Sequence, residues 1–148
     1  MLEPMSIVFT KAEISRMKEG IPKGVEVRLN VDAMDPVDNN SLTMGFTYLV
    51  TYLPEMALVR VAGKANCRDS PENIKRALME FRKNKALPAD LGATALNMIN
   101  TNTAVNVIFF IRPFGLMPPF VPPPIIPAAA ITAAASPPAK PAVKSKGR

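Results

Sequence analysis

The feature that most constrains the fold is a run of alternating side chains at residues 42–53. Every second residue from Leu42 to Tyr52 is large and apolar, and three Thr residues, a Gly and a Leu stand between them. A segment that alternates with a period of two and is rich in β-branched and aromatic side chains predicts a strand with one buried face. The chain must therefore contain a sheet with a covered side.

The same period occurs on both sides of this run. Residues 25–32 alternate Val or Leu with polar residues, and residues 56–65 form a third predicted strand. Turn-rich segments at 35–40 and 53–55 separate the three. Such short connections favour an antiparallel meander, because parallel neighbours need long crossovers. Residues 6–18 are compatible with either a further strand or a helix.

Two helices are predicted after the strands. Ser70-Pro71-Glu72 is a favourable helix start, with an N-cap hydroxyl, a proline at the first helical position and then an acid. Pro88 opens a longer helix that runs to about Ile111. Its last turns, residues 105–111, are apolar on nearly every side. This pattern is typical of a helix with contacts on more than one side and predicts burial in an oligomer.

The chain changes character after Arg112. Ten of its 16 prolines follow this residue, so the segment cannot form a regular helix and favours polyproline II. Residues 114–135 carry no charge, but their prolines would leave backbone carbonyls unpaired in lipid, so we predict no membrane span. The expected division is a domain at 1–127 and an Ala/Pro-rich, basic, disordered tail at 128–148.

Composition excludes several kinds of enzyme. The chain has no His and one Cys, Cys67, so Ser-His and Cys-His nucleophiles and zinc sites built on several Cys and His are excluded. We predict no enzymatic activity, no cofactor and no metal. Asp32, Asp35 and Asp38 lack the Gly and distal Glu of a calcium loop and are expected in a solvated turn. The unpaired Cys and the lack of a signal peptide favour the cytoplasm.

The net charge of +6 lies mainly in the tail. Four of the 18 basic residues and no acidic ones follow Pro113, which leaves 14 basic and 12 acidic residues before it. Basic residues favour an alternative function, in which the protein binds a ribosome or other RNA through its tail and its first helix. The candidate residues for that alternative are Lys75, Arg76, Arg82, Lys83, Lys140, Lys144, Lys146 and Arg148.

One arrangement is similar to a known family. An alternating strand at 26–32 is followed by two long strands, a long helix and the segment Phe-Gly-Leu-Met-Pro-Pro-Phe-Val-Pro-Pro at 114–123. This order resembles the SecB-type export chaperones. The resemblance implies an α+β fold, with a four-stranded antiparallel sheet and helices on one face. It also implies a homotetramer assembled as a dimer of dimers, and ATP-independent holding of unfolded or nascent polypeptides. That family is typically acidic, so no contact with a translocase motor is transferred.

Holding many sequences requires apolar surface that adapts to its partner, for which aromatic side chains and Met are suited. The alternative for each such residue is ordinary packing in the core. The candidates for polypeptide binding or assembly are Phe46, Tyr48, Tyr52, Phe109, Phe110, Phe114, Met117 and Phe120.

Overall fold

A four-stranded antiparallel sheet forms the framework of the protein in a computed structural model that describes residues 1–119. The spatial order of its strands is β1-β4-β3-β2, so β1 and β2 are the two edges. The strands are β1 (Glu3–Arg16), β2 (Gly24–Pro36), β3 (Ser41–Leu53) and β4 (Ala57–Arg68).

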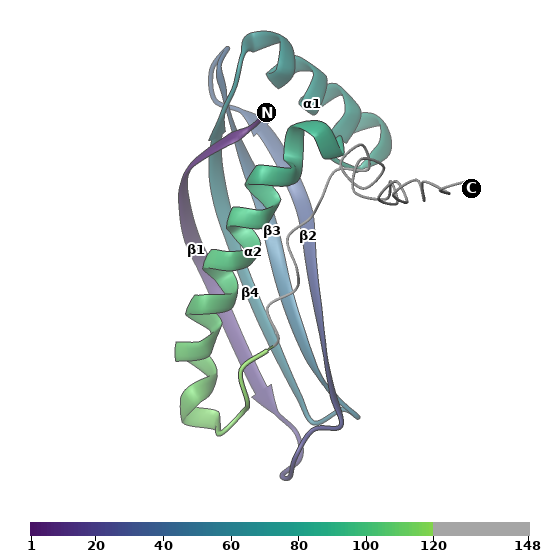
Figure 1. Ribbon diagram of the computed structural model, residues 1–148, viewed down its shortest axis with the longest axis vertical. Coiled ribbons are helices and arrows are strands. Elements are labelled where there is room, and N and C mark those ends of the chain that lie inside the picture. Colours follow the sequence, from purple (N-terminus) through teal and green to yellow (C-terminus); the bar gives the residue numbers. More distant parts are fainter. Residues whose placement is uncertain (120–148) are drawn as a thin grey trace, which may run out of the picture.

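Both helices, α1 (Pro71–Asn84) and α2 (Ala89–Ile111), cover the same face of the sheet (Figure 1). The predicted α+β architecture is confirmed. The Ser70 hydroxyl accepts a hydrogen bond from the Asn73 amide at 3.4 Å, as expected for an N-cap. After α2 the chain makes one 3-10 turn, η1 (Arg112–Phe114).

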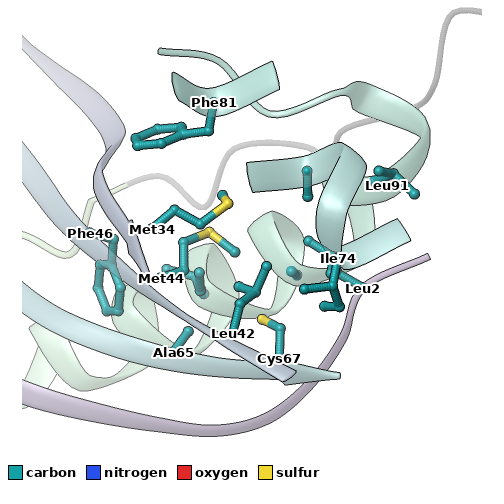
Figure 2. Close-up of a cluster of buried hydrophobic side chains, with 13 residues drawn as sticks. Leu2, Met34, Leu42, Met44, Phe46, Ala65, Cys67, Ile74, Phe81 and Leu91 are labelled. Carbon is teal, nitrogen blue, oxygen red and sulfur yellow. The ribbon is translucent and has the colours of Figure 1, made fainter. Parts of the chain in front are cut away.

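The core lies between the sheet and the helices, in two clusters. Phe46 of β3 packs in the first cluster with side chains of α1 and of the start of α2, among them Ile74 and Leu91 (Figure 2). The second cluster lies under the C-terminal half of α2 and includes Tyr48 and Tyr52. Burying each large apolar side chain contributes about 1.5–3 kcal/mol. The alternation in β3 therefore fixes which face the helices cover.

The ambiguous N-terminal stretch is the edge strand β1. Its pairing with β4 contains two register shifts, and the second lies between Phe9 and Lys11. The unpaired Thr10 moves the following side chains to the other side, because successive side chains of a strand alternate. Ile7 and Ile14 therefore both pack on the helix-covered core, although they are an odd number of residues apart.

Candidate functional site

The C-terminal end of α2 combines buried and exposed apolar side chains. Val107 and Ile111 are buried in the core beneath the helix. Val105 and Phe109, four residues apart and so on one side of the helix, lie outward, and Phe109 is 64% exposed. α2 carries no charged residue after Asp90, so its outward side presents only neutral groups. The exposed surface at this end of the helix is therefore uncharged and largely apolar.

The turn after α2 adds two further exposed side chains. The residue Gly115 has a φ of 64°, a left-handed conformation that suits glycine, and its amide donates to the Arg112 carbonyl at 3.1 Å. The chain then returns to the sheet, where Leu116 is buried and the Tyr52 hydroxyl donates to the Met117 carbonyl at 2.7 Å. The side chains of Phe114 and Met117 stay 40% and 46% exposed.

An open groove of about 440 Å³ lies between β1 and the end of α2. Its wall combines two strand residues with the helix end and the turn, and none of the lining residues is charged. The lining residues are Ala12, Ile14, Phe109, Phe110, Pro113 and Phe114. We call this groove, together with the exposed side chains of Val105 and Met117, the helix-end surface.

One polar side chain links the two walls of the groove. The Arg16 guanidinium at the end of β1 donates hydrogen bonds to the Phe114 carbonyl and to the Lys18 carbonyl. A cation that bonds two backbone carbonyls satisfies acceptors left over by a helix end and a turn. This contact ties the turn after α2 to β1, so the two walls of the groove are linked.

The structure separates the predicted binding residues into two groups. Phe109, Phe110 and Phe114 line the groove, and Met117 lies in the segment that follows; Phe110 is half-buried and the other three are exposed. Phe120 lies outside the described residues.

The other three predicted residues are not accessible, which corrects the expectation that they form a surface. Phe46, Tyr48 and Tyr52 are fully buried between the sheet and the helices. The ring of Phe46 packs edge-on against that of Phe9, with centroids 6.3 Å apart. Burial also raises the pKa of both tyrosine hydroxyls to about 12. Their role is to fill the core.

Sequence reasoning missed the groove residues Ala12, Ile14 and Pro113. The signal was present for Ile14, an apolar residue in a possible strand. Because the register shift at Thr10 interrupts the alternation, the sequence does not indicate to which face of the sheet Ile14 points. The position of β1 beside α2 follows from strand order, which no local pattern encodes.

The candidate RNA-binding residues of α1 are exposed, but they are not all free. The Arg76 guanidinium bonds the Asp90 carboxylate and holds the pKa of that carboxyl below its ordinary value. Lys75, Arg82 and Lys83 are exposed on the helix. Lys140, Lys144, Lys146 and Arg148 lie outside the described residues. RNA binding therefore stays a prediction.

The expectation of a solvated turn holds only for Asp38, because β2 runs on to Pro36 and so includes Asp32 and Asp35 as strand residues. The Asp38 carboxylate accepts a hydrogen bond from the Asn40 amide at 2.7 Å, and Asp32 accepts one from Thr47. Within residues 1–119 no cluster of three potential metal ligands occurs. Cys67 is buried, and burial raises the pKa of its thiol to about 11.

Within residues 1–119, no helix has the length and apolar character needed to cross a membrane.

Comparison with known proteins places the fold. No protein-family model matches the sequence, and neither does any curated protein. Among solved structures, the chain is similar to the SecB-like chaperone Rv1957 of Mycobacterium tuberculosis, in complex with a ChAD peptide from the HigA1 antitoxin. The match has a TM-score of 0.58 at 10% identity and covers 84% of this chain and 88% of that one. The protein thus has a SecB-like fold, which confirms the resemblance drawn from its sequence.

Proposed function

We propose that this protein is a non-enzymatic chaperone or adaptor that holds unfolded or nascent polypeptides at the helix-end surface. The exposure of Phe109 and Phe114 beside an uncharged groove is the observation that carries the proposal. Folded proteins bury most large apolar side chains, whereas unfolded chains present them. An exposed aromatic patch therefore selects unfolded chains, since both partners remove apolar area from water.

The composition of the surface suits partners of varied sequence. Aromatic side chains supply large contact area at low entropic cost, and the flexible side chain of Met117 adapts to irregular partners. The groove has no charged lining residue, so binding leaves no charge buried without a partner. The similar mycobacterial chaperone is itself in complex with a peptide, which supports polypeptide as the ligand class.

The proposal includes a homo-oligomer, a dimer or tetramer, that acts in the cytoplasm. The outward side of α2 is uncharged along residues 91–111, and a long exposed helix face without charge is typical of a subunit contact. Assembly through the earlier turns of α2 need not compete with client binding, because the exposed neutral residues Thr94, Thr101 and Asn102 precede the aromatic residues at its end.

Suppression of aggregation tests the function. Increasing amounts of the protein are added to an unfolded polypeptide diluted from denaturant, and light scattering follows aggregation. The double variant Phe109→Ser/Phe114→Ser should need about tenfold more protein for equal protection, because two partly exposed aromatic anchors are lost. Met79→Ser is the matched control, since Met79 is also well exposed but lies on α1. Equal protection by the double variant and the wild type would contradict the proposal.

A further inference from the structure

The connection between β1 and β2 is a second unusual surface. These strands are the two edges of the sheet, so residues 17–23 cross its whole end. Both ends of the connection are anchored beside the β3–β4 turn. The Met17 amide donates to the Met56 carbonyl at 2.9 Å, and the Lys23 amide donates to the Leu53 carbonyl at 2.9 Å. The residues between the anchors project beyond the strands (Figure 1).

The tip of this connection presents an apolar side chain to solvent. Ile21 is 83% exposed, the highest value among the exposed large hydrophobic residues of the described chain, and Met17 is also exposed. Gly20 has a φ of 119°, which lets the chain turn sharply just before Ile21. Pro22 follows and fixes the backbone on the other side. Because both ends are anchored, the tip is held in place rather than free to fold back.

Basic residues flank the apolar tip in the sequence. Arg16, Lys18 and Lys23 lie within or next to the connection, against the carboxylates of Glu19 in the connection and Glu55 in the adjacent β3–β4 turn. Lys18 and Lys23 form no ion pair within residues 1–119. An open hollow of about 620 Å³ beside the connection is lined by Arg16, Lys18 and Glu19, among others. A phosphate group in this hollow would lie near Lys18 and near the Arg16 guanidinium, which also donates to the Phe114 and Lys18 carbonyls.

We propose that residues 17–23 dock the protein peripherally on an anionic lipid bilayer, with Ile21 inserted at the interface and the cations next to lipid phosphates. A protruding apolar side chain can insert into a bilayer, because the lipids move aside. It is less suited to binding an extended peptide, which needs a groove. The flanking lysines suit the negative potential of anionic lipid surfaces. This inference does not rest on polypeptide holding, because the helix-end surface contains none of these residues.

The absence of Trp from the sequence gives a direct test. Ile21→Trp in the full chain places the only indole at the tip. Its emission is measured with vesicles made of equal parts phosphatidylcholine and phosphatidylglycerol, and with phosphatidylcholine alone. A blue shift with the anionic vesicles only is the expected result. Val37→Trp is the matched control, because Val37 is exposed in the β2–β3 connection at the other end of the sheet, and its emission should not shift.

Vesicle sedimentation adds a measure of affinity. Ile21→Ser should weaken binding to the anionic vesicles about tenfold, as expected when one large aliphatic side chain no longer leaves water, and Val37→Ser should not. Equal sedimentation of wild type and Ile21→Ser would overturn the proposal, since the basic tail would then account for binding. If the emission of the Ile21→Trp variant shifts with protein concentration and ignores vesicles, the proposal is overturned in favour of contact between copies of the chain.

Discussion

The Tyr52 hydroxyl of β3 donates a hydrogen bond to the backbone carbonyl of Met117, 65 residues later in the chain. This bond fastens the segment after α2 to the sheet and so positions Phe114 and Met117 at the helix-end surface. On the same face of β3, the Tyr48 hydroxyl is buried without a hydrogen-bond partner among the described residues. We therefore expect opposite effects on stability when each tyrosine hydroxyl is removed.

Removal of the Tyr52 hydroxyl should destabilise the protein. Tyr52→Phe leaves the Met117 carbonyl without its donor and should lower the free energy of unfolding by about 1 kcal/mol. Tyr48→Phe removes a buried hydroxyl that has no partner within residues 1–119 and should leave stability unchanged or raise it. Urea unfolding of both variants measures the difference, and equal destabilisation by the two would refute this assignment of the hydrogen bond.

Both tyrosines should titrate late. The chain has only these two and no Trp, so tyrosinate absorbance reports on them alone. Burial raises their pKa from 10.0 to about 12, so the folded state holds these protons more tightly than the unfolded state. The stability due to neutral phenols is therefore complete below pH 10 and is lost as the pH rises through about 12. Normal titration of the native protein near pH 10 would contradict their burial.

Gly63 should not tolerate a side chain. A Cβ atom at this position would lie 2.6 Å from the Val8 carbonyl oxygen and 2.7 Å from the Phe46 ring. Gly63→Ala should cost about 1–3 kcal/mol of stability, because backbone and a buried ring cannot move aside freely. Gly24→Ala is the control, since the nearest atom there belongs to Leu53 at 3.6 Å. Thermal unfolding that shows no difference between the two variants would argue against this packing.

Cys67 should be unreactive in the folded protein. Its thiol is buried, and a pKa raised to about 11 keeps it protonated near neutral pH, whereas the thiolate is the reactive form. Alkylation by iodoacetamide should therefore be slow until denaturant unfolds the chain. Rapid labelling of the native protein, at the rate of a free thiol, would place Cys67 at the surface instead.

Much of the fold was predictable because its strands keep a strict period. β3 alternates without interruption, so its element type and its buried face follow directly from the sequence. β1 could not be assigned, because the register shifts at Met5 and Thr10 break its alternation. The start of α1 was predictable from the local cap at Ser70. Local chemistry thus determined the elements wherever no bulge intervened.

The candidate site was only partly predictable. The apolar excess at the end of α2 singled out Phe109 and Phe114, and the structure places both in the lining of one groove. Alternation in β3 marked Phe46 and Tyr48 as facing one side, but which layer covers that side depends on how the helices return over the sheet. Ile21 gave no signal at all, because a single aliphatic residue in a loop is common and only its exposure in the fold makes it notable.

The most direct test of the central claim is the mass of the complex that the protein forms with a permanently unfolded polypeptide, measured by light scattering after size-exclusion chromatography. The wild type and Met79→Ser should each form a complex whose mass exceeds that of the chaperone alone. Phe109→Ser/Phe114→Ser should keep the mass of the uncomplexed protein. A wild-type protein that never changes mass in the presence of the unfolded chain would contradict polypeptide holding itself.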